Sequence, residues 1–372
     1  MTVTTPAEAY VLALASLPSM GPRRLGALLA RHAPADAWAL VLGGRAGGDR
    51  AVAEVLGARA GPVADGWRRA AHAVDVAELW GRHTSAGHLV LWRGDDRFPP
   101  ALADDREPPA LLFAAGSLGA LDGPRVAIVG TRRCTRYGRD VAVELGRDLA
   151  AAGVRVVSGL ALGIDGAAHE GALAARAAPP VAVVATGLDV VYPRRHRPLW
   201  DRVAAAGVVL TEAPLGTAPE RWRFPARNRM IAALADVVVV VESHAAGGSL
   251  ITVKEALERD RPVMAVPGPV RSPASAGTNR LLYDGLAPVC DAGDVLLELG
   301  LHAEVATRGA GEQPAIPPEA APILDALGWQ PATLDSLVNR TGRTPADVAL
   351  ALSRLERNGL VTASGAWWER TA

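Results

Sequence analysis

The feature that most constrains the fold is a regular alternation, between Arg125 and Cys290, of short apolar runs with helix-length amphipathic segments. Seven such runs follow one another along the chain: VAIV, VRVV, VAVVA, VVLT, VVVVVE, VMAVP and APVC. They are almost wholly apolar, whereas a strand with one solvated face alternates apolar and polar residues. The helical segments between them are long enough for the crossovers that parallel strands require. The sequence therefore predicts an α/β fold with an extended, Rossmann-like, doubly wound and mostly parallel sheet.

An N-terminal helical region precedes this sheet. Residues 1–95 are rich in alanine with helical periodicity, and Gly21-Pro22 separates two helical stretches. The pattern resembles a helix-hairpin-helix, whose second helix can offer backbone amides to a DNA phosphate, although a helix start at Gly-Pro is commoner without any such contact. We predict a helix-hairpin-helix or SAM-like domain over residues 1–95 and a Rossmann-like domain over residues 96–302. The proline- and acid-rich stretch 93–117 is interpreted as an ordered connector.

A second small domain follows the sheet. Residues 303–317 form a loose, polar linker, and residues 318–372 contain three helical segments and a hairpin, which is the outline of a winged helix. Thr344-Pro345 starts the third helix, and its predicted buried face comprises Val348, Ala351, Leu352 and Leu355. Arg354 and Arg357 on this helix are balanced by acids, so the sequence leaves open whether the domain contacts DNA or protein.

Composition excludes few classes of function. Lysines plus arginines equal aspartates plus glutamates, 39 each, so no global charge indicates a polyanionic partner. Cys134 and Cys290 fit no metal or redox spacing, so we expect no metal. No signal peptide is recognised, and no stretch reaches the roughly 18 apolar residues of a membrane span. We therefore expect a cytoplasmic protein.

Candidate ligand-binding residues follow the apolar runs, because ligands of open parallel sheets bind beyond the carboxyl ends of the strands. Glycine, serine and arginine gather there, and these residues suit an anionic ligand. No G-x-x-x-x-G-K-[ST] loop is present, and the first strand is not followed by G-x-G-x-x-G, so ATP hydrolysis and ordinary dinucleotide binding are disfavoured. We expect no cofactor.

Three groups of arginines in separate loops favour a longer anion. They lie within residues 125–139, 194–197 and 221–229. A parallel sheet can bring such loops to one edge, and a row of cations longer than a dinucleotide suits the backbone of a single nucleic acid strand. Trp222 and Phe224 lie among these arginines and could stack a base or pack in the core.

Evidence for catalysis is weak. Asp165 and His169 are four residues apart on one predicted helix and could form an acid/base pair, but a helix cap and a satisfied histidine explain them equally. We assign no catalytic residue. The alternative is a nucleotide-binding enzyme of the phosphoribohydrolase type, for which Glu242 and Glu255 are the nearest candidate acids. A third hypothesis is an adaptor that acts mainly through the winged helix.

Several motifs in register resemble those of the DNA-processing protein A (DprA/Smf) family. They are VGTRRCTRYG, VVSGLALGIDGAAHEGAL, TGLDVVYPRRHRPLW, FPARNRMI, GGSLITVKEAL and AVPGPV, and they span about residues 90 to 290. The resemblance implies a single-stranded DNA-binding protein of natural transformation (competence) and DNA recombination. It implies that the protein protects incoming strands and loads the RecA recombinase, as a homodimer and without established catalysis.

The resemblance also implies which residues bind DNA. By position in the motifs these are Gly130, Thr131, Arg132, Ser158, Gly159, Arg227, Asn228, Arg229, Gly247, Gly248 and Ser249. Threonine at 131 replaces the usual serine and keeps the hydroxyl. Glycine at 247 replaces a serine, which leaves the role of that hydroxyl in doubt. We expect Arg132 and Arg229 to pair with phosphates, and backbone amides after Gly130 and Ser158 to donate to others.

Overall fold

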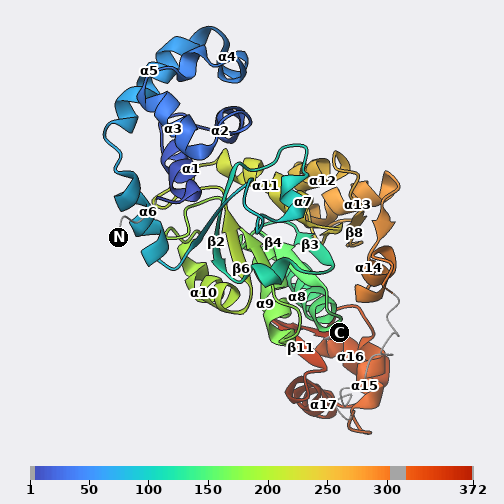
Figure 1. Cartoon of the computed structure of the whole chain (residues 1–372). Coiled ribbons are helices and arrows are strands. Elements are labelled where there is room, and N and C mark those ends of the chain that lie inside the picture. Colours follow the sequence, from blue (N-terminus) through green and yellow to red (C-terminus); the bar gives the residue numbers. More distant parts are fainter. Residues whose placement is uncertain (1–4, 302–315, 371–372) are drawn as a thin grey trace. The chain divides into compact units, whose positions relative to one another are not determined.

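The computed structural model describes residues 5–301 and 316–370 and has two compact units, residues 1–303 and 304–372 (Figure 1). The predicted linker comprises residues 303–317, of which residues 303–315 lie outside the described residues. The predicted domain boundaries, which include the division at residues 95 and 96, stay a prediction.

A nine-stranded sheet organises the first unit, in the order β1-β2-β6-β5-β4-β3-β7-β8-β9. The strands from β3 to β9 run parallel, while β2 pairs antiparallel with both β1 and β6. The strands are β1 (Leu89–Trp92), β2 (Leu111–Gly116), β3 (Arg125–Val129), β4 (Arg155–Ser158), β5 (Val181–Val183), β6 (Val208–Thr211), β7 (Val237–Val240), β8 (Val263–Ala265) and β9 (Ala287–Pro288). Each of the seven apolar runs contains one parallel strand, so the predicted fold class is confirmed.

Helices cover both faces of this sheet, and successive strand residues alternate between two apolar layers. Ala127 of β3 packs in the layer under the helices over residues 100–103, 223–234 and 249–257. Ile128 packs in the opposite layer, under the helices over residues 136–151, 164–175 and 292–298. The helices that follow the first parallel strand are α8 (Arg136–Ala151), α9 (Ile164–Ala175), α10 (Arg197–Ala206), α11 (Arg223–Leu234), α12 (Ser249–Leu257), α13 (Ala276–Tyr283) and α14 (Ala292–Glu298). No helix within the described ranges is long and apolar enough to cross a membrane.

The N-terminal helices share a core with one end of the sheet. They are α1 (Ala7–Ala15), α2 (Pro22–Leu29), α3 (Pro34–Leu42), α4 (Arg50–Leu56), α5 (Ala60–Ala71) and α6 (Val76–Ser85), and a short α7 (Pro100–Ala103) precedes β2. Leu12 of α1 belongs to the same apolar cluster as Phe113 of β2 and Val209 of β6. The predicted break at Gly21-Pro22 is confirmed, because Gly21 precedes the first residue of α2.

Two strands were missed by the sequence analysis. β1 lies inside the stretch assigned to the helical domain, and β2 lies inside residues 93–117, which were interpreted as a connector. The apolar run of β2 is flanked by prolines and acids, which are typical of a connector and not of a strand. β1 has only four residues, which is too short for a clear pattern. At this edge of the sheet β2 pairs antiparallel with β6 and β1 pairs antiparallel with β2, so both lie outside the repeating strand–helix pattern of the parallel strands.

The second unit is a winged helix, as predicted. Its elements are α15 (Ala321–Leu327), β10 (Ala332–Thr333), α16 (Leu334–Thr341), α17 (Pro345–Arg357), β11 (Val361–Ser364) and β12 (Trp367–Arg370), with strand order β10-β12-β11. The Thr344 hydroxyl accepts a hydrogen bond from the Asp347 amide at 3.2 Å, which caps α17. The predicted buried face of this helix, which includes Val348 and Leu352, is buried.

Helices α8 and α9 approach closely enough to require glycine. A Cβ atom at Gly171 would lie 2.0 Å from the Val143 carbonyl oxygen, and one at Gly146 would lie 2.3 Å from the Ala168 carbonyl oxygen. We predict that Gly171→Ala lowers the free energy of unfolding by about 1–3 kcal/mol, because two backbones must move apart. Urea unfolding of the full chain measures this change.

Gly66→Ala is the matched control for that substitution. Gly66 also lies inside a helix, α5, but a Cβ atom added there would have no other atom within 4 Å. Alanine there should stabilise by up to about 1 kcal/mol through helix propensity. Equal effects of the two substitutions would refute the close-packing argument.

Candidate nucleic-acid interface

The centre of the sheet contains a topological switch point. From β3 the chain continues to β4 on one side, and β7 lies on the other side of β3. A cleft of about 730 Å³ opens there, and we call it the Arg132 cleft. It is lined by the turn after β3, the start of α11 and the turn before α12, together with Tyr192 from the loop after β5. Ligands of doubly wound folds bind at this place.

Most of the residues predicted to bind DNA line this cleft. They are Gly130, Thr131, Arg132, Arg227, Asn228, Gly247, Gly248 and Ser249. Ser158, Gly159 and Arg229 are not among its lining residues. The structure thus brings together turns that lie far apart along the chain, at residues 130 and 247 for example.

The turn after β3 is shaped by contacts with the end of β7. The Thr131 amide donates to the Glu242 carbonyl at 2.8 Å, and the Arg133 amide donates to the Thr131 hydroxyl at 3.2 Å. A Cβ atom at Gly130 would lie 2.5 Å from Ile164, so only glycine fits. These contacts occupy two of the backbone amides that were predicted to bind phosphate. They leave the side chains of Arg132 and Arg133 exposed.

Two aromatic rings lie beside the Arg132 side chain. The Arg132 guanidinium carbon lies 4.8 Å from the ring centroid of Phe224, and the ring of Tyr192 lies 5.4 Å from that of Phe224. A guanidinium over a ring is a cation–π contact. Phe224 was one of two aromatic residues that the sequence suggested for stacking. Tyr192 was missed, although it follows a parallel strand in the segment GLDVVYPRR.

Several arginines of the predicted groups are paired with acids, so the positive charge available to a ligand occupies a smaller region than predicted. Arg125, Arg136, Arg139 and Arg197, from the predicted arginine groups, each lie within 4.0 Å of an acid. Within residues 5–301 and 316–370, no acid lies within that distance of Arg132, Arg133 or Arg221, which all line the Arg132 cleft. The acid among the lining residues, Asp165, is buried and accepts a hydrogen bond from the Gly159 amide. Because arginines outnumber this one acid among the lining residues, the cleft is positively charged.

Arg227 stabilises the strand ends next to the cleft. Its guanidinium donates to the carbonyl of Gly159 at 3.0 Å and to that of Val183. Burial lowers the pKa of Arg227 to about 10, against the opposing effect of Asp165. A Cβ atom at Gly159 would lie 2.5 Å from this guanidinium, so Gly159 makes room for it. Arg227 therefore orders the ends of β4 and β5.

The predicted role of the Ser158 turn requires correction. The Ser158 hydroxyl is buried and donates to the Ile128 carbonyl at 2.7 Å, which ties β4 to β3. The Gly159 amide donates to the Asp165 carboxylate at 3.2 Å. Both groups already have partners inside the protein, so the structure gives them a structural role.

Arg229 requires the same correction. Arg229 lies two residues after Arg227 on α11, and residues at that spacing do not share a helix face. Arg229 therefore does not line the Arg132 cleft. Its guanidinium forms an ion pair with Glu212 at 2.5 Å and donates to the Glu107 carbonyl at 2.6 Å. Burial raises the pKa of Glu212, and the Arg229 charge opposes this shift. Arg229 thus joins α11 to the end of β6.

The acids that a catalytic alternative needs are engaged elsewhere. The Glu242 carboxylate is buried and accepts hydrogen bonds from the amide and hydroxyl of Thr135 at 2.8 and 2.6 Å. Glu255 pairs with Arg259 at 2.6 Å and does not line the cleft. His169 is buried, which lowers its pKa to about 3. Among the described residues, no group of three or more histidines, cysteines and acids could hold a metal.

Comparisons with known proteins match both units. A family model described as "DNA recombination-mediator protein A" matches residues 89–300, and a "DprA winged helix domain" model matches residues 305–365. The "DNA processing protein DprA" of Bacillus subtilis is 39% identical over 204 residues, which are 55% of this chain and 68% of that protein.

Two solved structures are also similar. DNA processing protein A from Streptococcus pneumoniae superposes with a TM-score of 0.67 at 32% identity, over 80% of this chain and 99% of that chain. DNA processing protein A from Helicobacter pylori has a TM-score of 0.52 at 31% identity, over 57% of this chain and 95% of that chain. The description of the latter structure refers to its single-stranded DNA binding mode.

We predict that Arg229→Met lowers the free energy of unfolding by about 3 kcal/mol, because it leaves Glu212 largely buried and unpaired. The double variant Arg229→Met/Glu212→Leu should recover much of this loss. Arg139→Met is the control, because it breaks an exposed pair with Glu170 and should cost at most about 1 kcal/mol. Chemical denaturation measures all three, and similar losses for Arg229→Met and Arg139→Met would refute the structural role.

Proposed function

Because the chain belongs to the DprA/Smf family of DNA recombination-mediator proteins, we propose that it binds single-stranded DNA in the Arg132 cleft and processes DNA during natural transformation. One observation carries the proposal: Arg132, Arg133 and Arg221, all without acidic partners in the described part of the chain, converge beside Phe224 and Tyr192. Cations that follow a backbone, next to aromatic rings, are the usual means of binding a single strand.

We assign a separate role in binding to each kind of residue that lines the cleft. The exposed guanidinium groups of Arg132, Arg133 and Arg221 pair with successive phosphates. Phe224 offers a ring to a base, and the Arg132 guanidinium beside that ring can stay in place while it binds phosphate. The glycines at 247 and 248 let the strand approach the backbone before α12. None of these contacts reads a base edge, so binding has little sequence preference.

We propose that this binding is not accompanied by catalysis. A phosphoribohydrolase needs an acid at the sugar, and both candidate acids have other partners. Glu242 accepts hydrogen bonds from Thr135, the N-cap residue of α8, and Glu255 pairs with Arg259. The remaining acid, Asp165, lines the cleft but is buried and accepts from the Gly159 amide. This arrangement supports a binding protein over the enzyme alternative.

We further propose, from the family, that the protein acts in the cytoplasm, protects incoming strands and loads the RecA recombinase as a homodimer. Exposed apolar side chains support a self-association surface. Leu257 of α12 is 52% exposed and Tyr283 of α13 is 80% exposed. Leu257 lines a recess between these helices together with Leu250, Val253 and Leu281. The Tyr283 ring lies 4.9 Å from the guanidinium carbon of Arg280, which also lines this recess. Whether this chain loads a recombinase can be tested by following recombinase ATP hydrolysis on strands already coated with a single-strand binding protein.

We predict that Arg132→Ala weakens binding to an oligothymidine strand by at least about tenfold at low salt and reduces the slope of log affinity against log salt by about 0.7, because one phosphate contact is lost. Phe224→Ala should weaken binding by about five- to hundredfold with little change in slope, because stacking is insensitive to salt. Fluorescence anisotropy at several salt concentrations measures both quantities.

Arg139→Ala is the control for these variants, since Arg139 is an exposed arginine paired with Glu170 and lies outside the cleft. It should leave the affinity within about twofold of the unsubstituted protein. If Arg132→Ala and Arg139→Ala have the same affinity and salt slope, the Arg132 cleft is not the binding site.

For self-association we predict that Leu257→Asp/Tyr283→Asp converts a dimer into a monomer in sedimentation velocity, because two charges would be buried in the interface. Val55→Asp is the control, since Val55 is also exposed, at 45%, but lies on α4. An unsubstituted protein that sediments as a monomer, or a double variant that remains dimeric, would contradict this surface.

A further inference from the structure

We propose that a bound strand continues beyond the Arg132 cleft into a second groove, which lies between α2 and the start of α11. This inference rests on the proposed function and extends it to the N-terminal helices. The α2 groove, as we call it, has a volume of about 1080 Å³. Apart from the buried Arg227 and Arg229, its cationic and aromatic members are Arg23 and Arg24 from the start of α2, with Trp222 and Arg223 at the start of α11.

The start of α11 separates the two grooves and lines both. Arg221 and Phe224 line the Arg132 cleft, whereas Trp222 and Arg223 line the α2 groove. Arg227, within the same helix, borders both. Because these side chains come from four consecutive residues, a strand that leaves the cleft over Phe224 reaches Trp222 within about one helical turn of 5.4 Å.

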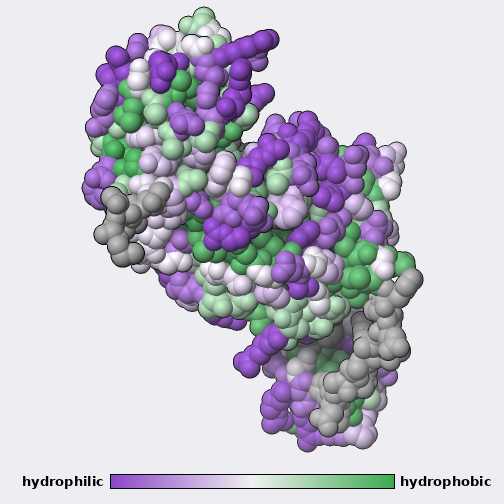
Figure 2. Space-filling view, viewed as in Figure 1, coloured by the Kyte–Doolittle hydropathy of each residue, from purple (hydrophilic) through white to green (hydrophobic). Residues whose placement is uncertain are grey.

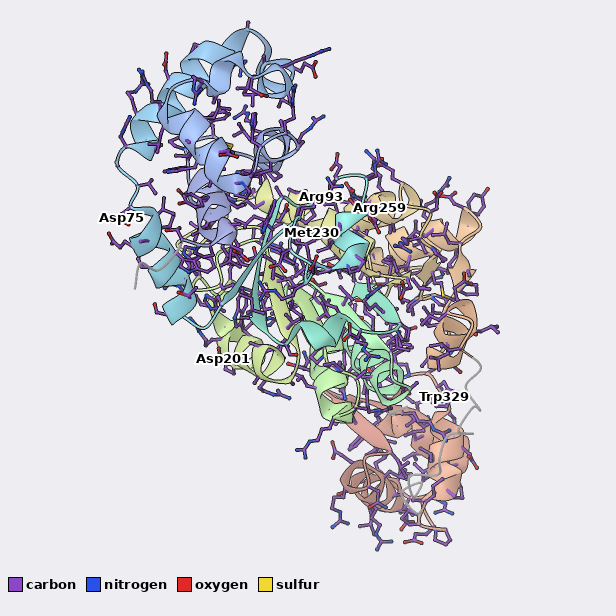
Figure 3. The ribbon with its side chains drawn as sticks, in the orientation of Figure 1. Asp75, Arg93, Asp201, Met230, Arg259 and Trp329 are labelled. Carbon is purple, nitrogen blue, oxygen red and sulfur yellow. The ribbon has the colours of Figure 1, made fainter. Side chains whose placement is uncertain are left out.

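The charge of the α2 groove suits the same polyanion. Its two acids are already paired, Glu54 with Arg50 at 3.2 Å and Glu212 with Arg229 at 2.5 Å. Arg23 has no acidic partner within the described ranges, and it also lines an adjoining recess with Arg93. Figure 3 places Arg93 where the N-terminal helices meet the sheet, and Figure 2 shows hydrophilic surface on both sides of that junction.

Trp222 is the second observation that indicates a nucleic acid strand. Its side chain is 59% exposed, which is high for so large an apolar ring. Arg223 lies 4.4 Å from the ring centroid, and the indole N–H donates to Glu220, so the ring has a fixed position beside a cation. Glu220 also lies 3.8 Å from Arg223. An exposed, oriented indole among arginines can stack a base.

The α2 groove is a fixed feature of the first unit. Leu25 and Leu28 of α2 are buried in the cluster that also contains Phe113 of the sheet. The indole N–H of Trp67 donates to the Pro18 carbonyl at 3.0 Å, in the loop that leads to α2. The helical hairpin therefore holds Arg23 at a constant place relative to α11, which a continuous strand path requires.

Binding of the full chain to oligothymidines of increasing length tests this inference. The shortest strand that binds fills the Arg132 cleft, and longer strands should gain affinity by reaching the α2 groove. We expect Trp222→Ala to leave the affinity for the shortest strand unchanged and to weaken the longest strand by about five- to hundredfold. Arg23→Ala should reduce the salt slope for the longest strand by about 0.7 and leave that for the shortest strand unaltered.

Two control variants separate this path from general effects. Trp222→Phe keeps an aromatic ring and should retain most of the gain with length. Arg69→Ala removes an arginine that is also exposed, on α5 and outside the groove, and should act like the unsubstituted protein. The inference is overturned if Trp222→Ala and Arg23→Ala match Arg69→Ala at every length, or if they weaken short and long strands equally. Failure of the proposed function itself has a different signature, since no strand of any length would then respond to Arg132→Ala.

Discussion

The interface depends on one buried carboxylate, that of Glu242 at the end of β7. Its side chain accepts from the amide and hydroxyl of Thr135, at the start of α8, while its own carbonyl accepts from the Thr131 amide. Three hydrogen bonds thereby join the carboxyl ends of the two strands at the switch point. Gly138 lies so close that a Cβ atom there would be 2.3 Å from this carboxylate. A buried charge needs such partners, and they in turn fix the turn that presents Arg132.

The arginines at and near the start of helix α11 are of two kinds: buried ones that bond inside the protein and others that line the grooves. Arg227 and Arg229 are buried and bond to carbonyls and to Glu212, so they set the positions of the neighbouring strand ends. Residues 221–224, at the helix start, project side chains that line the two grooves. Buried guanidinium groups whose donors are already used cannot gain much from a phosphate, whereas exposed ones exchange counterions for it. Exposure, more than residue type, therefore identifies the arginines that we propose as DNA ligands.

The sequence was sufficient for the sheet but only partly sufficient for the site. Parallel strands buried on both faces leave an unmistakable pattern of apolar runs, whereas the antiparallel β1 and β2 do not repeat it. The glycine turns at 130 and 247 could be assigned to one edge because parallel topology brings strand ends together. The roles of Arg227 and Arg229 could not be assigned, since they depend on Gly159 and Glu212, which are distant in sequence. Tyr192 enters the cleft from a loop that no periodicity describes.

A chain with equal numbers of acids and bases can still hold a polyanion, because charges of one sign can gather locally. Arginines away from the interface, such as Arg139 and Arg259, lie against acids, so their fields largely cancel within a Debye length of about 10 Å. Arg132, Arg133 and Arg221 have no such partner among the described residues, and they share one cleft, where their potentials add. In the proposed binding mode, attraction to this locally positive cleft concentrates encounters of a strand at the switch point.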